Sequence, residues 1–473
     1  MTTAATNSDQ AKRTGMIAPL IVGAAGFMQT FDSSAITVAL PPMAADFGVA
    51  ALSLNLVITA YLIGATAFLP VCGWAADRFG ARRIFLLAIA GFGLASLACA
   101  LSTNLPMLIA ARIVQGCMGA LLIPVGRIIV MRAVPRNEVV KAASLLTLPV
   151  MFGPLLGPTI GGVLLSYGTW HLLFVLNVAM AALGYWSILK FIDDIPAEEP
   201  RPLDLKGYAL VALALVGVSY GISMAAQADA NLLTPLALIA GGIVCGALYW
   251  RHCNAQQHPI LDLRVLRLPT VYATNVGGLF HRMLVSAGPF LLAMLFQLGF
   301  GLGPAATGGL IFAVALGSCF GRFIVTPFVR VIGFRNFLAF NSVALALSMA
   351  VCALFTPETP YAVIVAVLCV QGFLRSAQII GMLSLSYAEI SDRELGQVST
   401  ITSVSQQFAL SIGIAISVIA IQSAQAVLGE ADVTIGALAP AFIIVGALCL
   451  LPVFWLMRLP SDAGKHLINS KKD

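Results

Sequence analysis

The sequence is poor in charged residues. Only 10% of its 473 residues are Asp, Glu, Lys or Arg, whereas 59% are hydrophobic and the mean hydropathy is +0.96. A soluble domain carries about 25% charged residues, and a single soluble core stops growing near about 250–300 residues. This scarcity of charge excludes a soluble protein, so most of the apolar surface must face lipid. The net charge of +6 does not indicate nucleic-acid binding, because the basic residues are scattered between apolar segments.

Motifs for metal, disulfide, nucleotide and hydrolytic chemistry are also missing. The nine cysteines stand singly, without a Cys-x-x-Cys pair or a cysteine–histidine ligand spacing. There is no Gly-Lys-Ser/Thr phosphate loop, no His-Glu-x-x-His and no nucleophile beside a base. A cleavable signal peptide is not expected, since the first apolar segment is too long. The sequence therefore predicts no enzyme, no metal or other cofactor, and no direct use of ATP.

Long apolar segments dominate what is present. A helix needs about 20 apolar residues to cross the hydrocarbon core of a membrane. Fourteen segments reach that length: 17–41, 53–75, 84–101, 106–130, 142–165, 171–192, 207–227, 233–250, 270–297, 305–329, 336–355, 361–388, 397–425 and 436–457. The sequence thus predicts an all-α integral membrane protein with 14 transmembrane helices.

The loops between these segments are unequal in positive charge. With both termini cytoplasmic, none of the seven outer loops contains Lys or Arg, and 21 of the 26 basic residues fall on the inner side. Cytoplasmic loops carry an excess of Lys and Arg, and one missed span would spoil the segregation. We therefore expect a multi-pass protein of the plasma membrane, which in bacteria is the inner membrane, with both termini cytoplasmic.

Two polar linkers divide the chain. Residues 193–206 are charged and proline-rich, and residues 251–269 are polar; together they bracket two of the fourteen segments. We expect five parts: a cytoplasmic tail, a six-helix bundle, a linker with two inserted transmembrane helices, a second six-helix bundle and a second cytoplasmic tail. They cover residues 1–16, 17–192, 193–269, 270–457 and 458–473.

An internal repeat supports this division. Val114-Gln115-Gly116 in the fourth segment matches Val370-Gln371-Gly372 in the twelfth, and the loop DRFGARR from Asp77 matches RVIGFR from Arg330. Related halves with a substrate site between them are a common plan of secondary transporters. The repeat therefore favours a transporter, whereas a channel would need a fixed pore.

Ionisable residues inside the segments are few: Asp32, Arg112, His281, Arg282, Arg322 and Arg375, with Arg127 nearer a cytoplasmic end. Each charge at membrane depth costs roughly 2.5–3.5 kcal/mol and needs a partner or a function. Asp32 is the only deep acid. From the rise of a helix, it lies about 13 Å and Arg112 about 9 Å from the outer boundary.

These two residues lie at similar depth, so a pair between them is expected. One interpretation is an ion pair that only fixes helix packing. The other is proton coupling, in which the carboxyl releases its proton when the guanidinium approaches and binds one when it leaves.

Several motifs resemble those of one family. The loop GWAADRFGARR (73–83) resembles the signature loop of the major facilitator superfamily, and LIAARIVQGCMGALLIP (108–124) resembles its span-4 motif. The stretch GPLLGPTIGG (153–162) is similar to the span-5 motif of its antiporters. Four further segments resemble motifs of its fourteen-spanner drug:proton antiporters: FDSSAITVALP (31–41), WHLLFVLN (170–177), LDLKG (203–207) and HPILDLRVL (258–266).

The resemblance covers nearly the whole chain and implies the family's fold, two six-helix bundles plus two extra helices. It also implies roles for two sets of residues. The signature loop would act as a latch between the halves on the inner side, through Gly73, Asp77, Arg78, Gly80, Arg82 and Arg83. The span-5 motif would pack as an antiporter seam against the segment 305–329, through Gly153, Pro154, Gly157, Pro158, Gly161 and Gly162. The alternatives are topology anchoring for the loop and plain packing for the seam.

The resemblance implies a proton-coupled efflux transporter that exports small amphiphilic compounds by alternating access. Its partners would be a small-molecule substrate, protons and the lipid bilayer, with no nucleic acid, and it would be a monomer driven by the proton gradient without a cofactor. Asp32 and Arg112 would couple protons. The substrate cavity is expected to involve Phe27, Met28, Gln29, Phe31, Tyr61, Gln115, His281, Arg282 and Arg375.

The deep arginines leave the charge of the cargo open. Arg282 and Arg375 have no deep acid beside them, so a rival hypothesis is export of an organic anion such as a carboxylate metabolite or a metal chelate. The alternative for Arg282, Arg322 and Arg375 is snorkelling or capping of carbonyls, and for His281 it is hydrogen-bonded packing. A membrane receptor or enzyme is a weaker hypothesis.

Overall fold

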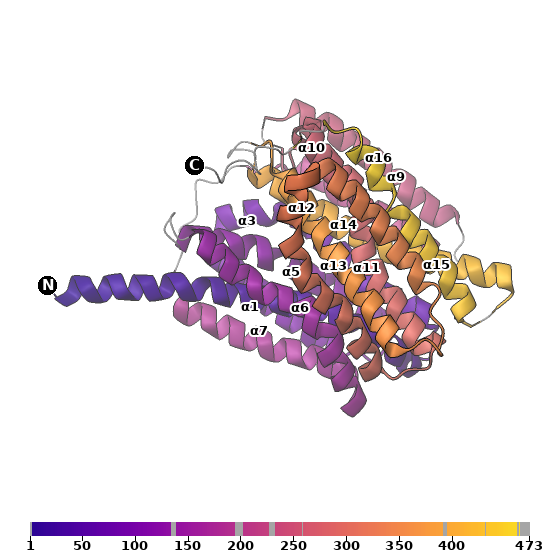
Figure 1. Ribbon diagram of the computed structural model, residues 1–473. Coiled ribbons are helices and arrows are strands. Elements are labelled where there is room, and N and C mark those ends of the chain that lie inside the picture. The colour runs from indigo at the N-terminus through magenta and orange to yellow at the C-terminus, as the bar shows by residue number, and fades with distance from the viewer. Residues whose placement is uncertain are drawn as a thin grey trace.

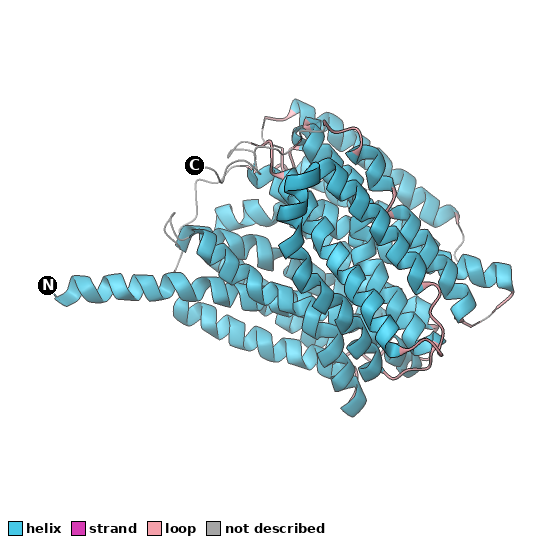
Figure 2. Cartoon of the chain, in the orientation of Figure 1, coloured by secondary structure: helices cyan, strands magenta, loops and turns pink. Residues whose placement is uncertain are grey.

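A computed structural model describes most of the chain, and Figures 1 and 2 show that its regular elements are helices. The described residues are 2–133, 139–193, 202–226, 232–257, 259–390, 395–430, 432–460 and 463. Most of the first predicted linker and nearly all of the predicted C-terminal tail lie outside them. Several side chains inside helices, among them that of Arg322, also lie outside the described set.

The N-terminal half contains long helices and a short break after the second. The helix α1 begins at Thr2, inside the predicted tail, so the membrane segment and the tail form one continuous helix. The elements are α1 (Thr2–Phe47), η1 (Ala51–Leu54), α2 (Asn55–Phe68), η2 (Leu69–Val71), α3 (Cys72–Phe79), α4 (Ala81–Ala100), α5 (Leu105–Ala133), α6 (Val139–Tyr167) and α7 (His171–Phe191).

The remaining helices form an inserted pair and a C-terminal half. The pair is α8 (Leu205–Ala225) and α9 (Leu233–Ala255). The C-terminal half consists of η4 (Leu263–Arg267), α10 (Pro269–Tyr272), η5 (Ala273–Gly277), α11 (Gly278–Met294), η6 (Leu295–Gly299), α12 (Pro304–Cys352), α13 (Tyr361–Ser386), α14 (Leu395–Leu428), α15 (Ile435–Leu448) and α16 (Leu451–Leu456).

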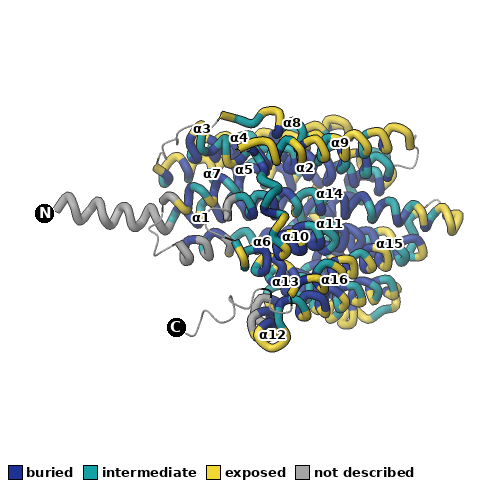
Figure 3. The backbone as a smooth tube through the Cα atoms, turned by 90° about the horizontal axis from the view of Figure 1, so that it is seen from above, coloured by how far each residue is buried: buried dark blue, intermediate teal, exposed yellow. Residues whose placement is uncertain are grey.

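Thirteen stretches of the described chain are long and apolar enough to cross a membrane. Each corresponds to one predicted segment from the second to the fourteenth, with α12 supplying two. The helix α1, which contains the first predicted segment, is not among the thirteen. The prediction of an all-helical, multi-span membrane protein is confirmed. Figure 3 shows buried positions inside the bundle and exposed ones along its outer faces.

The internal repeat is visible in the backbone. Gly80 links α3 to α4 with φ 90°, and Gly333 turns the chain inside α12 with φ 78°. Both lie in the repeated loops, at the place where each half needs a positive φ that only glycine adopts without strain. The single element α12 therefore contains two predicted segments, one on each side of the turn at Gly333.

The repeated Val-Gln-Gly triplets bring helices into close contact. A Cβ on Gly116 would overlap the carbonyl oxygen of Tyr61 in α2, and a Cβ on Gly372 would overlap that of Val314 in α12. Small residues at such crossings let backbones approach closely in lipid. The same crossing therefore holds α2 to α5 in one half and α12 to α13 in the other.

The halves meet along two lines. The helix α6 packs against α12, and α2 packs against α14. The inserted helix α8 contacts both α2 and α14, whereas α9 packs mainly on α8. The inserted pair thus covers the outside of the α2–α14 junction and leaves the centre of the molecule to the two halves.

We predict that Gly116→Ala destabilises the protein by about 1–3 kcal/mol, because overpacking forces backbones apart. The thermal unfolding midpoint in detergent measures the effect. Gly241→Ala in α9 is the control, since nothing lies within 4 Å of its added Cβ, and it should not lower the midpoint. Equal midpoints for the two variants would contradict the close crossing.

Candidate functional site

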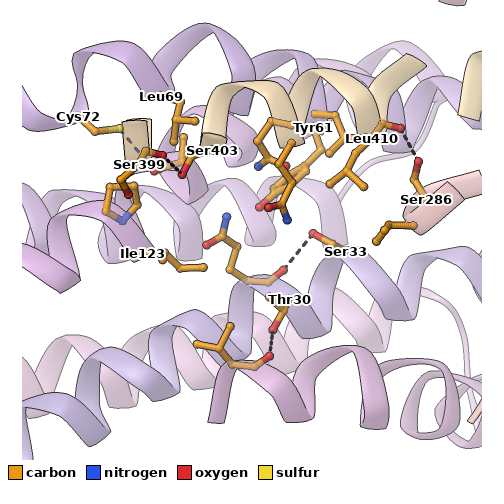
Figure 4. Close-up of a pocket in the computed structure, with 18 of the residues that line it drawn as sticks. Thr30, Ser33, Tyr61, Leu69, Cys72, Ile123, Ser286, Ser399, Ser403 and Leu410 are labelled. Atoms are coloured by element: carbon orange, nitrogen blue, oxygen red, sulfur yellow. Dashed lines mark hydrogen bonds between the residues drawn. The ribbon is translucent and has the colours of Figure 1, made fainter. Parts of the chain in front are cut away.

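A cavity of about 1070 Å³ lies between the two halves. The helices α1, α2, α5 and α6 form one wall and α11, α12, α13 and α14 form the other. Figure 4 shows Thr30, Ser33 and Tyr61 of the first half lining the space together with Ser286, Ser399 and Ser403 of the second. A site between two related halves is where a transporter of this plan binds its substrate.

The cavity reaches only one end of the molecule. Its wall runs from the middle of the helices to Arg78, Arg127 and Gln397, at the end predicted to be cytoplasmic. At the other end the halves touch. The Gln297 side chain donates from Nε2 to the Val38 carbonyl (3.0 Å), and Thr159 Oγ1 donates to the Gly308 carbonyl (3.5 Å).

An ion pair lies beside the cavity. Arg112 Nη1 of α5 is 2.6 Å from Asp32 Oδ2 of α1, and the two side chains are 0% and 2% exposed. The structure therefore brings together the two residues that were expected to pair. Burial at this level means that neither charge is compensated by water, so each depends on the other.

Amide side chains complete the surroundings of the carboxylate. Asn177 Nδ2 of α7 donates to Asp32 Oδ1 (2.6 Å), and Gln115 Nε2 donates to the same oxygen (3.2 Å). Gln115 also donates to Ser96 Oγ of α4 (2.8 Å) and accepts from Arg112 Nη1 (2.7 Å). Each described hydrogen bond to the Asp32 carboxylate comes from an N–H donor, which is the arrangement of an ionised acid.

Arg112 connects this network to the cavity. Its Nε donates to the Val57 carbonyl (3.2 Å), and its guanidinium lies 4.6 Å from the centre of the Tyr61 ring. Arg112 and Tyr61 both line the cavity, whereas Asp32 is 4% exposed and lies behind them. The carboxylate is therefore one layer of side chains away from the cavity.

The predicted cavity residues are only partly confirmed by their positions. Gln29, Tyr61 and Arg375 line the cavity; Phe27, Met28, Phe31, Gln115, His281 and Arg282 do not. On α1 the lining positions include Gln29, Ser33 and Thr37, which repeat every four residues and share one face of the helix. Met28 and Phe31 point into the packed core, where each is 1% exposed. The structure therefore does not place these six residues on the cavity wall, because helix rotation and not aromatic or charged character decides which side chains face it.

His281 and Arg282 lie in the interior of the second half. They are 2% and 9% exposed, and neither ring nitrogen of His281 has a hydrogen-bond partner in the described part of the chain. Arg375 differs from them because it is half-buried on the cavity wall. Of the deep positive charges of the second half whose side chains are described, Arg375 is therefore the one on the wall.

Sequence reasoning missed Asn177 and Ser96, and it assigned Gln115 to the cavity instead of to the carboxylate network. Asn177 ends the motif WHLLFVLN, so its sequence signal was present. The polar residues of α14 on the cavity wall, Ser403, Gln406 and Gln407, were also missed. They occur every three to four residues in an apolar helix, which is the pattern of one polar face.

The expected partner of the GPLLGPTIGG stretch is corrected by the structure. Added Cβ atoms on Gly153, Gly157 and Gly161 would meet Thr30, Ser34 and Ala35 of α1, not the segment 305–329. Gly162 does meet α12, at Pro304 and Ala305, and the Pro158 carbonyl lies against Gly308. A four-residue repeat keeps the glycines on one face of α6, and that face belongs to its own half.

Hydroxyl groups of α1 donate hydrogen bonds to carbonyls of α6 close to its prolines. Pro154 has no N–H, so it frees the carbonyl of Val150 one turn earlier. Thr30 Oγ1 donates to that carbonyl (3.0 Å), and Ser34 Oγ donates to the Gly153 carbonyl (3.0 Å). Pro154 and Pro158 themselves line the cavity. These two prolines therefore form part of the cavity wall without leaving the Val150 carbonyl unpaired in the membrane.

The signature loop lies at the mouth of the cavity. Gly73, Asp77 and Arg78 line it, Arg83 is exposed, and Arg82 Nη2 donates to the Leu189 carbonyl of α7 (3.1 Å). Nothing lies within 4 Å of a Cβ added to Gly73, so no neighbour requires glycine there in this conformation. Gly80 forms a tight turn with a positive φ. The latch between the halves stays a prediction.

Residues from both linkers lie on the other side of the mouth. Asp204 caps α8 by accepting from the Gly207 N–H (2.9 Å) and lies 2.8 Å from His252 Nε2. Asp262 lies 2.7 Å from Arg264 Nε. Although partial burial raises the pKa of Asp262, hydrogen bonds from Arg264 outweigh it and hold that pKa below its ordinary value. Among the described residues, no group of three His, Cys, Asp or Glu side chains is placed to hold a metal ion.

Two related helical halves, a cavity between them and a charge pair beside it define a membrane transporter of the two-bundle type. The family model of the major facilitator superfamily matches residues 22–414. The chain belongs to this superfamily, as its motifs indicated, and it is a transporter and not an enzyme.

Relatives and solved structures agree with this assignment. MdtD of Salmonella heidelberg (strain SL476), a protein named for multidrug resistance, is 30% identical over 454 residues, with 96% of each chain covered. MdtD of Salmonella typhi is equally similar. A D-xylose–proton symporter matches with TM-score 0.66 and 14% identity over 94% of this chain and 98% of its own. The POT family transporter PepTSo matches with TM-score 0.68 and 14% identity, over 97% of this chain and 99% of its own. The two structures show the shared fold.

We predict that Asn177→Ala lowers stability by about 1.5–3 kcal/mol, because it removes a hydrogen bond to a charged acceptor. In an Asp32→Asn background the same change should cost at least about 1 kcal/mol less, as expected for groups in one network. Thermal unfolding of the four proteins in detergent gives the coupling. Ser187→Ala, on the exposed face of α7, is the control. Additive costs for Asn177→Ala and Asp32→Asn would contradict the network.

Proposed function

We propose that this protein is a proton-coupled efflux transporter, a drug:proton antiporter, that exports small amphiphilic compounds by alternating access. The observation that carries the proposal is the buried Asp32–Arg112 pair one side-chain layer from the cavity. The relatives named for multidrug resistance support export of foreign or toxic compounds. The proton gradient would drive transport without a cofactor, and the protein would act as a monomer without nucleic-acid partners.

The described conformation corresponds to one step of this cycle. The cavity reaches the predicted cytoplasmic end, and the carboxylate of Asp32 is paired with Arg112, as it would be after a proton has been released inward. Cargo enters the cavity from the cytoplasm or the inner leaflet. After the halves rock, an external proton binds Asp32, the attraction to Arg112 is lost, and cargo leaves outward.

The location follows from the loop charges and the family. The protein would lie in the bacterial inner membrane with both termini cytoplasmic, because the predicted outer loops carry no Lys or Arg. In that orientation the outer contacts of α6 with α12 close the cavity toward the periplasm. Outward opening would then require the Gly162–Pro304 and Pro158–Gly308 contacts to separate.

We predict that Asp32→Asn abolishes export driven by a pH gradient in proteoliposomes, while the protein still inserts and unfolds cooperatively. An amide cannot exchange a proton in this range, so coupling is lost although downhill cargo exchange remains. Glu358→Gln, which neutralises an exposed acid in a predicted outer loop, is the control and should export normally. Full gradient-driven export by Asp32→Asn would defeat the assignment.

We predict that Gly308→Ala shifts the protein away from the conformation closed at the outer end. The added Cβ would overlap the Pro158 carbonyl of α6, and overpacking of this kind costs about 1–3 kcal/mol. Spin-label distances between the outer ends of α6 and α12 should lengthen.

Gly309→Ala is the matched control for this test, because its Cβ meets nothing within 4 Å. It changes the same helix by the same atom and should leave the distances unchanged. Unchanged distances in Gly308→Ala would contradict the role of this seam in closure.

A further inference from the structure

The charged groups of the cavity wall are unevenly balanced. Four arginines and two aspartates line the cavity: Arg78, Arg112, Arg127, Arg375, Asp77 and Asp204. Both acids lie at the mouth. Asp204 already contacts His252 and accepts a hydrogen bond from the Gly207 N–H at the start of α8. Arg112 is neutralised by Asp32 behind it. The positive charge that remains on the wall comes from Arg127 toward the mouth and from Arg375 in the interior.

Among the residues that the structure describes, no acid pairs with either of these two guanidinium groups. Within the part of the chain that the structure describes, neither makes a hydrogen bond or an ion pair, and Arg127 is exposed while Arg375 is half-buried. A charge at membrane depth that lacks a partner marks a substrate or ion pathway. Buried Asp32 does not line the cavity, so it leaves both groups available to a ligand.

The two arginines lie at different depths on different halves. Arg127 is 15 residues beyond Arg112 on α5, about 22 Å nearer the inner end by helix rise. Arg375 lies about 21 Å from the outer start of α13 at Tyr361, which is near the middle of the span. Arg375 is thus placed to bind a ligand inside the cavity, and Arg127 to attract one at the mouth.

The rest of the wall indicates the body of the ligand. Apolar side chains such as Ile58, Ile123, Leu155 and Ile311 alternate with hydroxyl and amide groups such as Ser286 and Gln407. Pockets that bind organic molecules are mainly apolar with a few placed polar groups. A cation would be repelled by Arg375, whereas an amphiphile with a carboxylate or similar anionic group would pair with it.

We propose that the cargo of this cavity is an amphiphilic organic anion, bound through its charged group by Arg375 and attracted to the mouth by Arg127. This inference rests on the proposed export function and specifies its substrate class. It replaces Arg282, the residue expected from sequence, with Arg127, because Arg282 does not line the cavity. In this exchange the anion leaves the cell and a proton enters from the outside, where protons are abundant. The negative charge of the cargo and the proton gradient therefore favour the same direction of exchange.

Binding to the purified full-length protein in detergent tests the charge preference without any gradient. The probes are dansylglycine, its neutral amide and the amine dansylcadaverine, followed by the corresponding acid, amide and amine on naphthyl and biphenyl skeletons. We expect the acid to bind at least about tenfold more tightly than the amide, and the amine to bind most weakly. Equal binding of the three forms, tighter binding of the amine, or no binding of the acid in every skeleton overturns the proposal.

Variants assign the preference to residues. Arg375→Gln should weaken acid binding at least about tenfold and leave amide binding unchanged, whereas Arg375→Lys should keep most of the preference. Arg127→Gln should slow acid association several-fold at low salt and not at 1 M salt, where charges are screened within about 3 Å. Arg251→Gln, an exposed change of equal charge at the end of α9, is the control. Equal loss for acid and amide in a folded Arg375→Gln overturns the assignment.

The two proposals fail separately. If Asp32→Asn retains gradient-driven export but the acid preference holds, the coupling scheme is wrong and the substrate class stands. If the amine binds best while export remains coupled to protons through Asp32, the substrate class is wrong and the export function stands.

Discussion

The buried pair between Asp32 and Arg112 is the interaction on which the structure of the first half depends. It joins α1 to α5, and the amides of Gln115 and Asn177 add α7 and, through Ser96, α4. Breaking a buried pair by removing one partner typically costs about 3–5 kcal/mol, because an uncompensated charge stays behind. Protonation would neutralise the carboxylate in place. In the proposed coupling scheme, structural stability and proton binding therefore involve the same atoms.

The second half repeats the backbone of the first but not its charges. Gly333 and Gly372 occupy the positions of Gly80 and Gly116, with the same turn and the same close helix crossing. Gln371, the counterpart of Gln115, donates to the sulfur of Met349, and among the described residues no contact between Gln371 and a carboxylate is found. The two halves thus share a backbone plan but differ in their charges. The first half contains the buried acid Asp32, and the second half places Arg375 on the cavity wall.

Close backbone contacts join helices both between the halves and within the first half. Between α6 and α12, the backbones of Pro158 and Gly308 are in contact. Inside the first half, Thr30 and Ser34 of α1 pack against the glycines of α6. The hydroxyl groups of these two residues donate hydrogen bonds to the Val150 and Gly153 carbonyls, which lie close to the prolines of α6. The contact of α6 with α1 lies within one half. Its contact with α12, between the halves, is a short one at the outer end.

The sequence by itself determined the spans, the family and the pairing of one acid with one arginine, and it predicts the orientation of the spans. Lipid imposes these features locally, since each crossing must be long, apolar and internally hydrogen-bonded. Only the tertiary structure decided which side chains face the cavity. Each residue turns the helix by about 100°, so Gln29 and Ser33 reach the cavity while Met28 and Phe31 do not. Helix rotation is fixed by packing against distant segments, such as α1 on the glycines of α6, and for that reason Arg375 reaches the wall and Arg282 remains behind it.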